Sequence, residues 1–307
     1  MNDDADKRCD SDTDTHFSDD WLRLREAADH RARHPEPTRV AAGWLTRRSD
    51  SSDSGGPAQA PRAVTLVDLG CGSGSNLRYL APRLPGAQQW RLIDHDAALL
   101  ERARERCTSL VSADGDPVQV DTCQATLAES IARGFEGVDL VSASALFDLL
   151  TAGEIDSLAG ACVDAGCAVL FALSVDGGIH FHDPLGDSVD DEEDRFIFAL
   201  YEAHQRRDKG AGAALGTDAP RKMRDTFERR GYRVVDAASP WRLDVDSLPL
   251  VEALMEGWRH ALHQQAPESG ARIERWHAAR LERIRLGQVR LSVGHRDLVA
   301  LPPGSAT

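Results

Sequence analysis

The fold of this chain is decided by the stretch Val64-Thr65-Leu66-Val67-Asp68-Leu69-Gly70-Cys71-Gly72-Ser73-Gly74. A short apolar run that ends at glycines is typical of a buried strand. This strand carries the carboxylate of Asp68 near its end. Glycines at alternate positions let the chain turn sharply and bring bare backbone against a ligand. The pattern therefore predicts a strand followed by a loop that cradles a nucleotide-type cofactor.

The spacing of the glycines separates this loop from the dinucleotide fingerprint. That fingerprint, G-x-G-x-x-G, needs a glycine at its sixth position, where helix and strand pack closely. Counted from Gly70, the sixth position is Ser75, which disfavours a nucleotide-dependent oxidoreductase. The acid two residues before Gly70 is instead suited to a positively charged amino group, such as that of an adenosine derivative bearing an amino acid.

At this point residues 64–77 resemble the first motif of class I S-adenosylmethionine-dependent methyltransferases. The match includes the acid, the three glycines and a helix that begins at Asn76, and supporting features continue to Leu173. The chain also looks like bacterial members of this superfamily that act on small molecules. The resemblance implies S-adenosylmethionine as cofactor, with S-adenosylhomocysteine as product. It implies cofactor contacts in the loop from Asp68, Gly70, Cys71, Gly72, Gly74 and Asn76. A glycine-rich turn without a ligand is the alternative.

A second carboxylate follows the next predicted strand, Trp90–Asp94. A ribose-binding acid is expected about 20 residues beyond such a loop, so Asp94 is predicted to accept hydrogen bonds from the ribose hydroxyls. His95 comes next and is included in the predicted cofactor site. The alternative is that Asp94 only caps the following helix.

The next two strands add further candidates. A third strand starts at Pro117 and runs toward Thr126, where the resembled family often carries an aspartate that meets the adenine amino group. A threonine hydroxyl can still accept that bond. A fourth strand, Val138–Ser142, leads into a segment that passes under the methionine part of the cofactor in this family. Ser144 is therefore expected to contact the cofactor, and Asp148 is expected to face the reaction zone.

These strands predict an α/β fold: a Rossmann-like, doubly wound, seven-stranded sheet, mostly parallel, with an antiparallel last strand and inserted helices that form a lid. The continuous apolar run Ala168–Leu173 suits a strand covered on both faces. We expect a disordered acidic tail over 1–18, an N-terminal helical lid and linker over 19–62, and a methyltransferase domain over 63–307. Helical insertions are expected at about 175–230 and 240–287.

The insertions lie where a doubly wound sheet would build its acceptor pocket. They offer aromatic and cationic side chains, with core packing as the alternative for each: Tyr201, His204, Arg206, Lys209, Trp241, Arg242 and Trp258. His180 and His182 lie in a predicted loop, without further ligands at zinc-like spacing, so no metal is expected. Methyl transfer needs mainly alignment and, where required, a base. The catalytic candidates are Asp148, His180 and His204.

Composition narrows the class of partner. The chain has 307 residues, 41% of them hydrophobic, and a formal net charge of −14. Because nucleic-acid binding depends on lysine and arginine displacing counterions, no nucleic acid is expected. No run approaches the roughly 20 apolar residues of a membrane span, and the acidic N-terminus is unlike a signal peptide. We expect a cytoplasmic protein with no membrane partner. Its oligomeric state is left open.

The sequence therefore predicts S-adenosylmethionine-dependent methyl transfer to an oxygen or nitrogen atom of a small molecule. The alternative is a non-catalytic S-adenosylmethionine-binding or interaction protein on the same fold.

Overall fold

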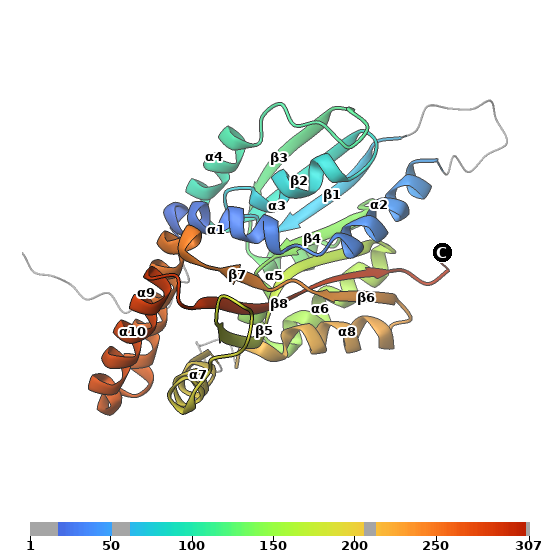
Figure 1. Ribbon diagram of the computed structural model, residues 1–307. Coiled ribbons are helices and arrows are strands. Elements are labelled where there is room, and N and C mark those ends of the chain that lie inside the picture. The colour runs from blue at the N-terminus through green and yellow to red at the C-terminus, as the bar shows by residue number, and fades with distance from the viewer. Residues whose placement is uncertain (1–17, 51–61, 206–212, 305–307) are drawn as a thin grey trace, which may run out of the picture.

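A computed structural model describes residues 18–50, 62–205 and 213–304. The predicted tail, apart from Ser18, and residues 51–61 of the predicted linker lie outside these ranges, as do Arg206 and Lys209. The described chain forms one mixed sheet flanked by helices (Figure 1). Its strands are β1 (Val64–Leu69), β2 (Gln88–Asp94), β3 (Val118–Gln124), β4 (Leu140–Ser144), β5 (Ala168–His182), β6 (Arg233–Ala238), β7 (Trp241–Leu243) and β8 (Arg290–Leu301).

The strand order is β3-β2-β1-β4-β5-β8-β6, and the short β7 pairs with β8 beside this path. Strands β1 to β5 pair in parallel, with Leu66 of β1 opposite Trp90 and Leu140 of its two neighbours. β8 is antiparallel to both β5 and β6. The predicted doubly wound sheet with an antiparallel last strand is therefore confirmed, and β7 is an eighth strand that the sequence did not indicate.

Helices cover both faces of the sheet. They are α1 (Asp19–Ala32), α2 (Pro35–Asp50), α3 (Ser75–Leu80), α4 (Ala97–Arg106), α5 (Leu127–Arg133), α6 (Ala152–Ala165), α7 (Glu192–Gln205), α8 (Ala219–Arg229), α9 (Leu248–Gln265) and α10 (Gly270–Arg285). Side chains of α5, α6 and α8 pack on one face around Phe171. Those of α2, α3 and α4 pack on the other face around Trp90. Alternate residues along each strand thus enter opposite cores, as the pleat requires.

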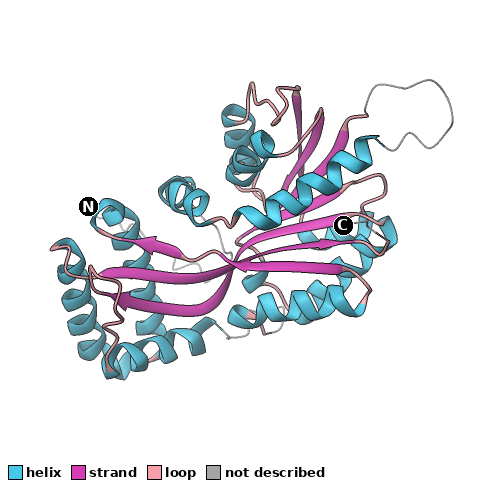
Figure 2. Ribbon diagram, turned by 45° about the vertical axis from the view of Figure 1, so that its right-hand side comes forward, coloured by secondary structure: helices cyan, strands magenta, loops and turns pink. Residues whose placement is uncertain are grey.

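A second lobe is built on the extended ends of two core strands. β5 and β8 stay paired from Val169 opposite Ala300 to His182 opposite Arg290, with two irregularities in register. Figure 2 shows this ribbon leaving the core and carrying helices at its far end. There α7, α9 and α10 pack around Phe181, Trp258 and Trp276. The lobe therefore has its own apolar core but shares its strands with the main sheet.

The structure corrects the expected loop at His180. Residues 168–182 form one strand, in which Phe181 is fully buried while the neighbouring histidines are not. The expected insertion at about 175–230 is also mixed in character, because α8 packs on the core sheet through Met223 and Phe227. Residues 168–182 form a strand rather than a loop because β8 continues alongside β5 and supplies the hydrogen bonds that keep this segment extended.

Candidate functional site

The glycine loop joins β1 to α3 in a conformation that suits glycine. Gly70, Gly72 and Gly74 have φ values of 60°, 51° and 84°, in the left-handed region that side chains disfavour. Space is also short: a Cβ on Gly72 would lie 3.0 Å from Leu22 Cδ1, and one on Gly74 would lie 2.6 Å from Cys107 Sγ. Both the backbone conformation and the packing therefore require glycine at positions 72 and 74.

Asp94 ends β2 directly beside this loop. Its Oδ2 accepts a hydrogen bond of 2.8 Å from the Gly72 N–H, and its Oδ1 accepts one of 3.0 Å from the Asp96 N–H. Asp96, rather than Asp94, caps α4 through the N–H groups of Ala98 and Leu99. The role of a mere helix cap is thus taken by another residue, and the buried Asp94 carboxylate stands at the loop.

Asp68 lies deeper, behind Asn76. Its Oδ1 accepts hydrogen bonds from Asn76 Nδ2 at 2.7 Å and from Ser142 Oγ at 2.8 Å. Its Oδ2 is buried and has no hydrogen-bond partner among the described residues. Burial raises the pKa of this carboxyl to about 6, against the hydrogen bonds from Asn76 and Ser142. A buried acceptor of this kind is costly unless a donor meets it.

Helix α1 covers the loop and is held there by charged pairs. Glu26 pairs with Arg78 of α3, at 2.6 Å, and Asp19 pairs with Arg106 of α4, also at 2.6 Å. His30 Nε2 lies 3.1 Å from the Ser75 carbonyl oxygen. Ser18 is the N-cap of α1 and lines the neighbouring cavity described below, so the helix begins at the edge of the site.

A cavity of about 310 Å³ lies between α1 and the loop, and we call it the loop cavity. The predicted cofactor residues that line it are Gly70, Cys71, Gly72, Asn76, Asp94, His95 and Ser144. Burial raises the pKa of the Cys71 thiol well above its ordinary value, so this side chain stays neutral in the wall.

Three predicted cofactor residues stand apart from the lining. Asp68 lies behind Asn76, to which it is hydrogen-bonded, and Gly74 is the N-cap of α3. Thr126 caps α5: its hydroxyl accepts from the Glu129 N–H, and Glu129 bonds back to the Thr126 N–H. The sequence signal for this capping box, a threonine followed three residues later by glutamate, was present.

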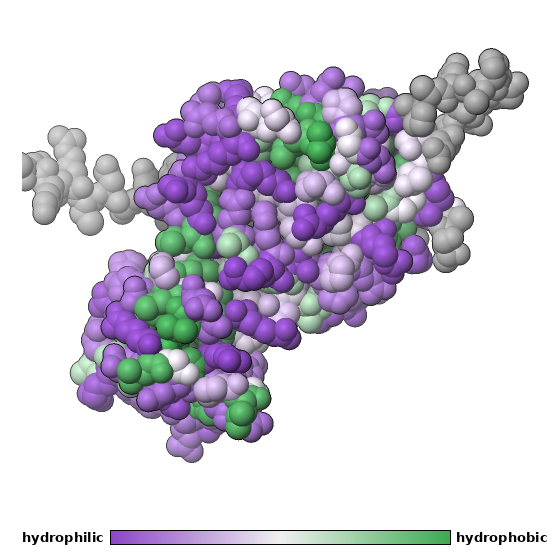
Figure 3. Space-filling model, turned by 45° about the horizontal axis from the view of Figure 1, so that its top comes forward, coloured by the Kyte–Doolittle hydropathy of each residue, from purple (hydrophilic) through white to green (hydrophobic). Residues whose placement is uncertain are grey.

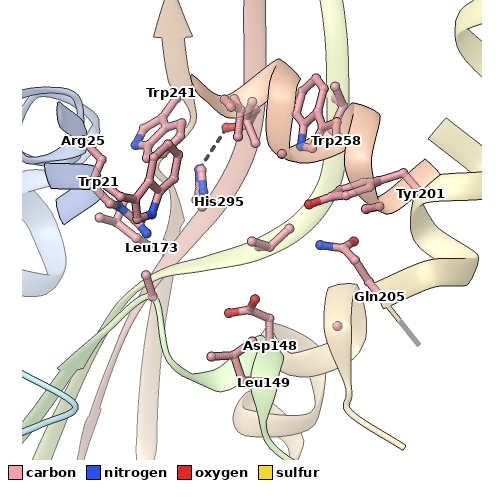
Figure 4. A pocket seen from close by; sticks show the side chains of 18 of the residues that line it. Trp21, Arg25, Asp148, Leu149, Leu173, Tyr201, Gln205, Trp241, Trp258 and His295 are labelled. Atoms are coloured by element: carbon pink, nitrogen blue, oxygen red, sulfur yellow. Dashed lines mark hydrogen bonds between the residues drawn. The ribbon is translucent and has the colours of Figure 1, made fainter. Parts of the chain in front are cut away.

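A second cavity of about 540 Å³ adjoins the first, and we call it the aromatic cavity. Arg25, Ala145 and Leu149 line both. Figure 4 shows Trp21 and Trp241 on one side of the aromatic cavity, Tyr201 and Trp258 on the other, and Asp148 below. Figure 3 shows apolar surface on the second lobe and toward its junction with the core. The two cavities thus form one continuous site between the glycine loop and the second lobe.

The structure brings two of the three catalytic candidates together. Asp148 and His204 both line the aromatic cavity. His180 does not: it is 54% exposed, its Nδ1 lies 2.7 Å from Asp190 Oδ2, and it lines a neighbouring depression that shares Tyr201 and Gln205 with the aromatic cavity. The strand pairing that replaces the expected loop holds it there.

Sequence reasoning missed His295, which lines the aromatic cavity from β8. Its Nδ1 lies 2.9 Å from the Val293 carbonyl oxygen, so this nitrogen is the donor and Nε2 carries the lone pair. Its ring lies 5.1 Å from that of Trp241. Burial, followed by the charge of Arg25, lowers the pKa of His295 to about 3. The imidazole is therefore a neutral hydrogen-bond acceptor rather than a proton carrier near neutral pH.

Two residues that line the aromatic cavity have strained backbone. Ala145, after β4, and Leu173, within β5, both have a φ of 53°, a rare value for residues with a side chain. The Leu173 N–H donates to Asp297 Oδ1 at 3.0 Å. That buried carboxylate also accepts from Ser239 Oγ, at 2.8 Å, and from the His34 N–H, at 3.0 Å. Asp297 thus ties the irregularity of β5 at Leu173 to the junction between α1 and α2.

In the ranges that the structure describes, no group of three or more metal-ligating side chains could hold a metal ion. No helix in the same ranges is long and apolar enough to cross a membrane.

Residues 67–166 match a family model described as a methyltransferase domain. The chain carries a methyltransferase domain. The matched segment runs from β1 through the glycine loop to the end of α6, so the methyltransferase resemblance predicted from the sequence is confirmed where its motifs lie. No curated protein matches the sequence significantly.

Three solved structures are similar to this chain. The chain is 12% identical to a cyclopropane synthase from Mycobacterium tuberculosis, over 92% of this chain and 94% of that one, with a TM-score of 0.48. It is 18% identical to a methyltransferase from Geobacter sulfurreducens, covering 92% and 98%, with a TM-score of 0.41. It is 19% identical to one from Thiobacillus denitrificans, covering 93% and 99%, also at 0.41. Likenesses at this level carry no argument about substrate.

Proposed function

We propose that this protein transfers a methyl group from S-adenosylmethionine to an oxygen or nitrogen atom of a small-molecule acceptor. The observation that carries the proposal is the continuity of the two cavities, which share Arg25, Ala145 and Leu149. A bound cofactor in one and an acceptor in the other would meet at that boundary. The apolar, aromatic walls of the second cavity suit a small organic molecule.

The residues of the loop cavity fit this cofactor. Gly70 and Gly72 line the cavity without a side chain, and the Asp94 carboxylate would accept hydrogen bonds from the ribose hydroxyls. The unpartnered Oδ2 of Asp68 would receive the positive amino group. The cofactor supplies an electrophilic methyl on a sulfonium, so the protein has mainly to align the acceptor and shield it from water.

Asp148 and His204 are the candidates for removing a proton from the acceptor, because both line the aromatic cavity and both are titratable. His295 would orient the acceptor by accepting a hydrogen bond at Nε2. We leave His180 out of this proposal because it does not line the aromatic cavity and its imidazole is paired with Asp190.

Domain roles follow the same proposal. Residues 19–62 would act as the cover of the cofactor, and 63–307 as the methyltransferase domain with acceptor-binding insertions. Helices α1, α7 and α9 contribute Trp21, Tyr201 and Trp258 to the acceptor walls. The net charge of −14 favours an acceptor other than nucleic acid.

Isothermal titration with S-adenosylmethionine and S-adenosylhomocysteine tests the first step. Both should bind the intact protein, while Asp94→Ala and Gly72→Val should each lose binding. Arg290→Ala, at an exposed position on β8 outside both cavities, is the matched control and should bind normally. Absence of binding to the intact protein would refute the proposal.

The second step is a screen of amines, phenols and carboxylic acids with methyl-labelled cofactor. Transfer of label that falls in Asp148→Asn or His204→Gln supports an active transferase. Tight cofactor binding with no transfer to any acceptor would instead favour the alternative of a non-catalytic S-adenosylmethionine-binding protein.

A further inference from the structure

Arg33 is a buried cation at the edge of the loop cavity that the sequence did not single out. It is the first residue after α1, and its backbone N–H still bonds to the Asp29 carbonyl oxygen. Its side chain is only 2% exposed. A guanidinium carries five N–H donors and stays charged at all ordinary pH values, so each buried donor needs a partner.

The guanidinium has partners on two sides. Its Nε donates to Asp297 Oδ2 at 3.2 Å, and its Nη1 donates to Asn76 Oδ1 at 2.8 Å. Its carbon lies 4.5 Å from the centre of the Tyr79 ring. Nη2 is buried and has no hydrogen-bond partner among the described residues, although Arg33 lines the loop cavity. Arg33 therefore lines this cavity with a guanidinium of which one charged donor group, Nη2, is used by no described residue.

The unused donor has an unused acceptor as its counterpart. Asn76 accepts from Arg33 through Oδ1 and donates to Asp68 through Nδ2, so it stands between a cation and an acid. Asp68 Oδ2 also lacks a partner among the residues described. The Arg33 guanidinium and the Asp68 carboxylate, bridged by the Asn76 amide, therefore match the two charged ends of an α-amino acid: the cation suits its carboxylate and the acid suits its amino group.

We infer that Arg33 binds the carboxylate of the amino-acid part of the cofactor, an inference that rests on the proposed function. Nη2 of the guanidinium would donate to the carboxylate, while Asp297 and Asn76 fix the orientation of the guanidinium. Arg33 would thus be a positioning residue, which sets the direction of the sulfonium toward the aromatic cavity. It would also make the cover formed by α1 part of cofactor recognition.

Decarboxylated S-adenosylmethionine isolates this contact because it lacks only the carboxylate. Titration of the intact protein should show S-adenosylmethionine binding about 10- to 100-fold more tightly than the decarboxylated compound. In Arg33→Met the two ligands should bind with nearly equal affinity, with the loss confined to S-adenosylmethionine. Arg33→Lys, which keeps the charge but loses the fork, should show an intermediate preference.

Arg83→Met is the matched control. Arg83 lies 4.0 Å from the centre of the same Tyr79 ring but does not line the loop cavity, so its loss should leave the preference unchanged. Equal binding of both ligands by the intact protein would overturn the inference. So would an Arg33→Met protein that loses both ligands equally, which would mean a purely structural role. Failure of the intact protein to bind either ligand would instead refute the proposed function.

Discussion

Removal of the Asp194 carboxylate should destabilise the second lobe strongly. Asp194, in the first turn of α7, is fully buried. Its Oδ1 accepts from Trp276 Nε1 at 2.7 Å and from Arg280 Nε at 2.8 Å, and its Oδ2 pairs with Arg280 Nη2. In Asp194→Ala, the guanidinium of Arg280, itself 4% exposed, would keep only Asp191 as an acidic partner, at 2.8 Å.

The expected cost follows from this burial. Breaking a buried ion pair by removal of one partner costs about 3–5 kcal/mol, because here the buried charge of Arg280 would be left with only the 60% exposed carboxylate of Asp191 among the described acids. At about 2 °C per kcal/mol for a protein of this size, the melting temperature should fall by roughly 6–10 °C.

The neighbouring residue supplies the control. Glu193 pairs with Arg272 at 2.7 Å through both carboxylate oxygens, but the two side chains are 38% and 41% exposed. Glu193→Ala should therefore cost no more than about 1 kcal/mol. Thermal unfolding followed by near-ultraviolet circular dichroism, which reports on Trp276, measures both variants. Equal shifts for the two variants would refute the burial argument.

The same variants separate the two halves of the site. Tyr201, on α7, lines the aromatic cavity but not the loop cavity. Asp194→Ala should therefore lower acceptor turnover more than S-adenosylhomocysteine affinity. A variant that loses affinity for S-adenosylhomocysteine to the same degree would show that the lobes are not separable in this way.

Three further predictions concern single residues. Burial raises the pKa of Asp68 from 3.8 to about 6, so the buried carboxylate destabilises the fold increasingly as the pH rises through that range. In the absence of cofactor, Asp68→Asn should be up to about 3 kcal/mol more stable than the intact protein at pH 8 and equal to it at pH 4. Urea unfolding at the two pH values measures this difference. Burial lowers the pKa of His295 from 6.5 to about 3, so the folded state loses stability as the pH falls below 6.5. The intact protein should lose about 1.4 kcal/mol per pH unit relative to His295→Gln. Parallel plots of unfolding free energy against pH for the two proteins would contradict this. Gly74→Ala should cost about 1–3 kcal/mol and weaken cofactor binding, since the new Cβ meets Cys107 at a φ of 84°; a calorimetric melt identical to that of the intact protein would count against it.

The parts of the site that the sequence predicted are those fixed by local chemistry. The glycine loop needs positive φ values, and its acid comes from the strand directly before it, so neighbouring residues carry the whole signal. Asp94 could be predicted for the same reason, since it ends the next strand and its Oδ2 accepts from Gly72.

The parts that escaped depend on contacts between distant residues. In the sequence, Arg33 looks like an ordinary surface cation at a helix end. Its burial becomes apparent only in the structure, where Asp297 from the last strand lies against it. His295 lies in an apolar strand pattern, and nothing in that pattern shows that β8 runs along one side of a cavity. The sequence places His180 and Phe181 on opposite faces of an extended segment. Which of the two faces points toward the second lobe's core follows only from the packing of α7 and α9.

The position of β8 has a consequence for folding kinetics. Although it is the last strand in chain order, it lies between β5 and β6, and Val169 must pair with Ala300. Contacts of such long sequence separation close slowly, because the loop-closure entropy is lost before they form. Until residues 290–301 have been synthesised and docked, β5 and β6 expose unpaired edges that can recruit other chains. Refolding of this protein should therefore be slow and strongly dependent on protein concentration.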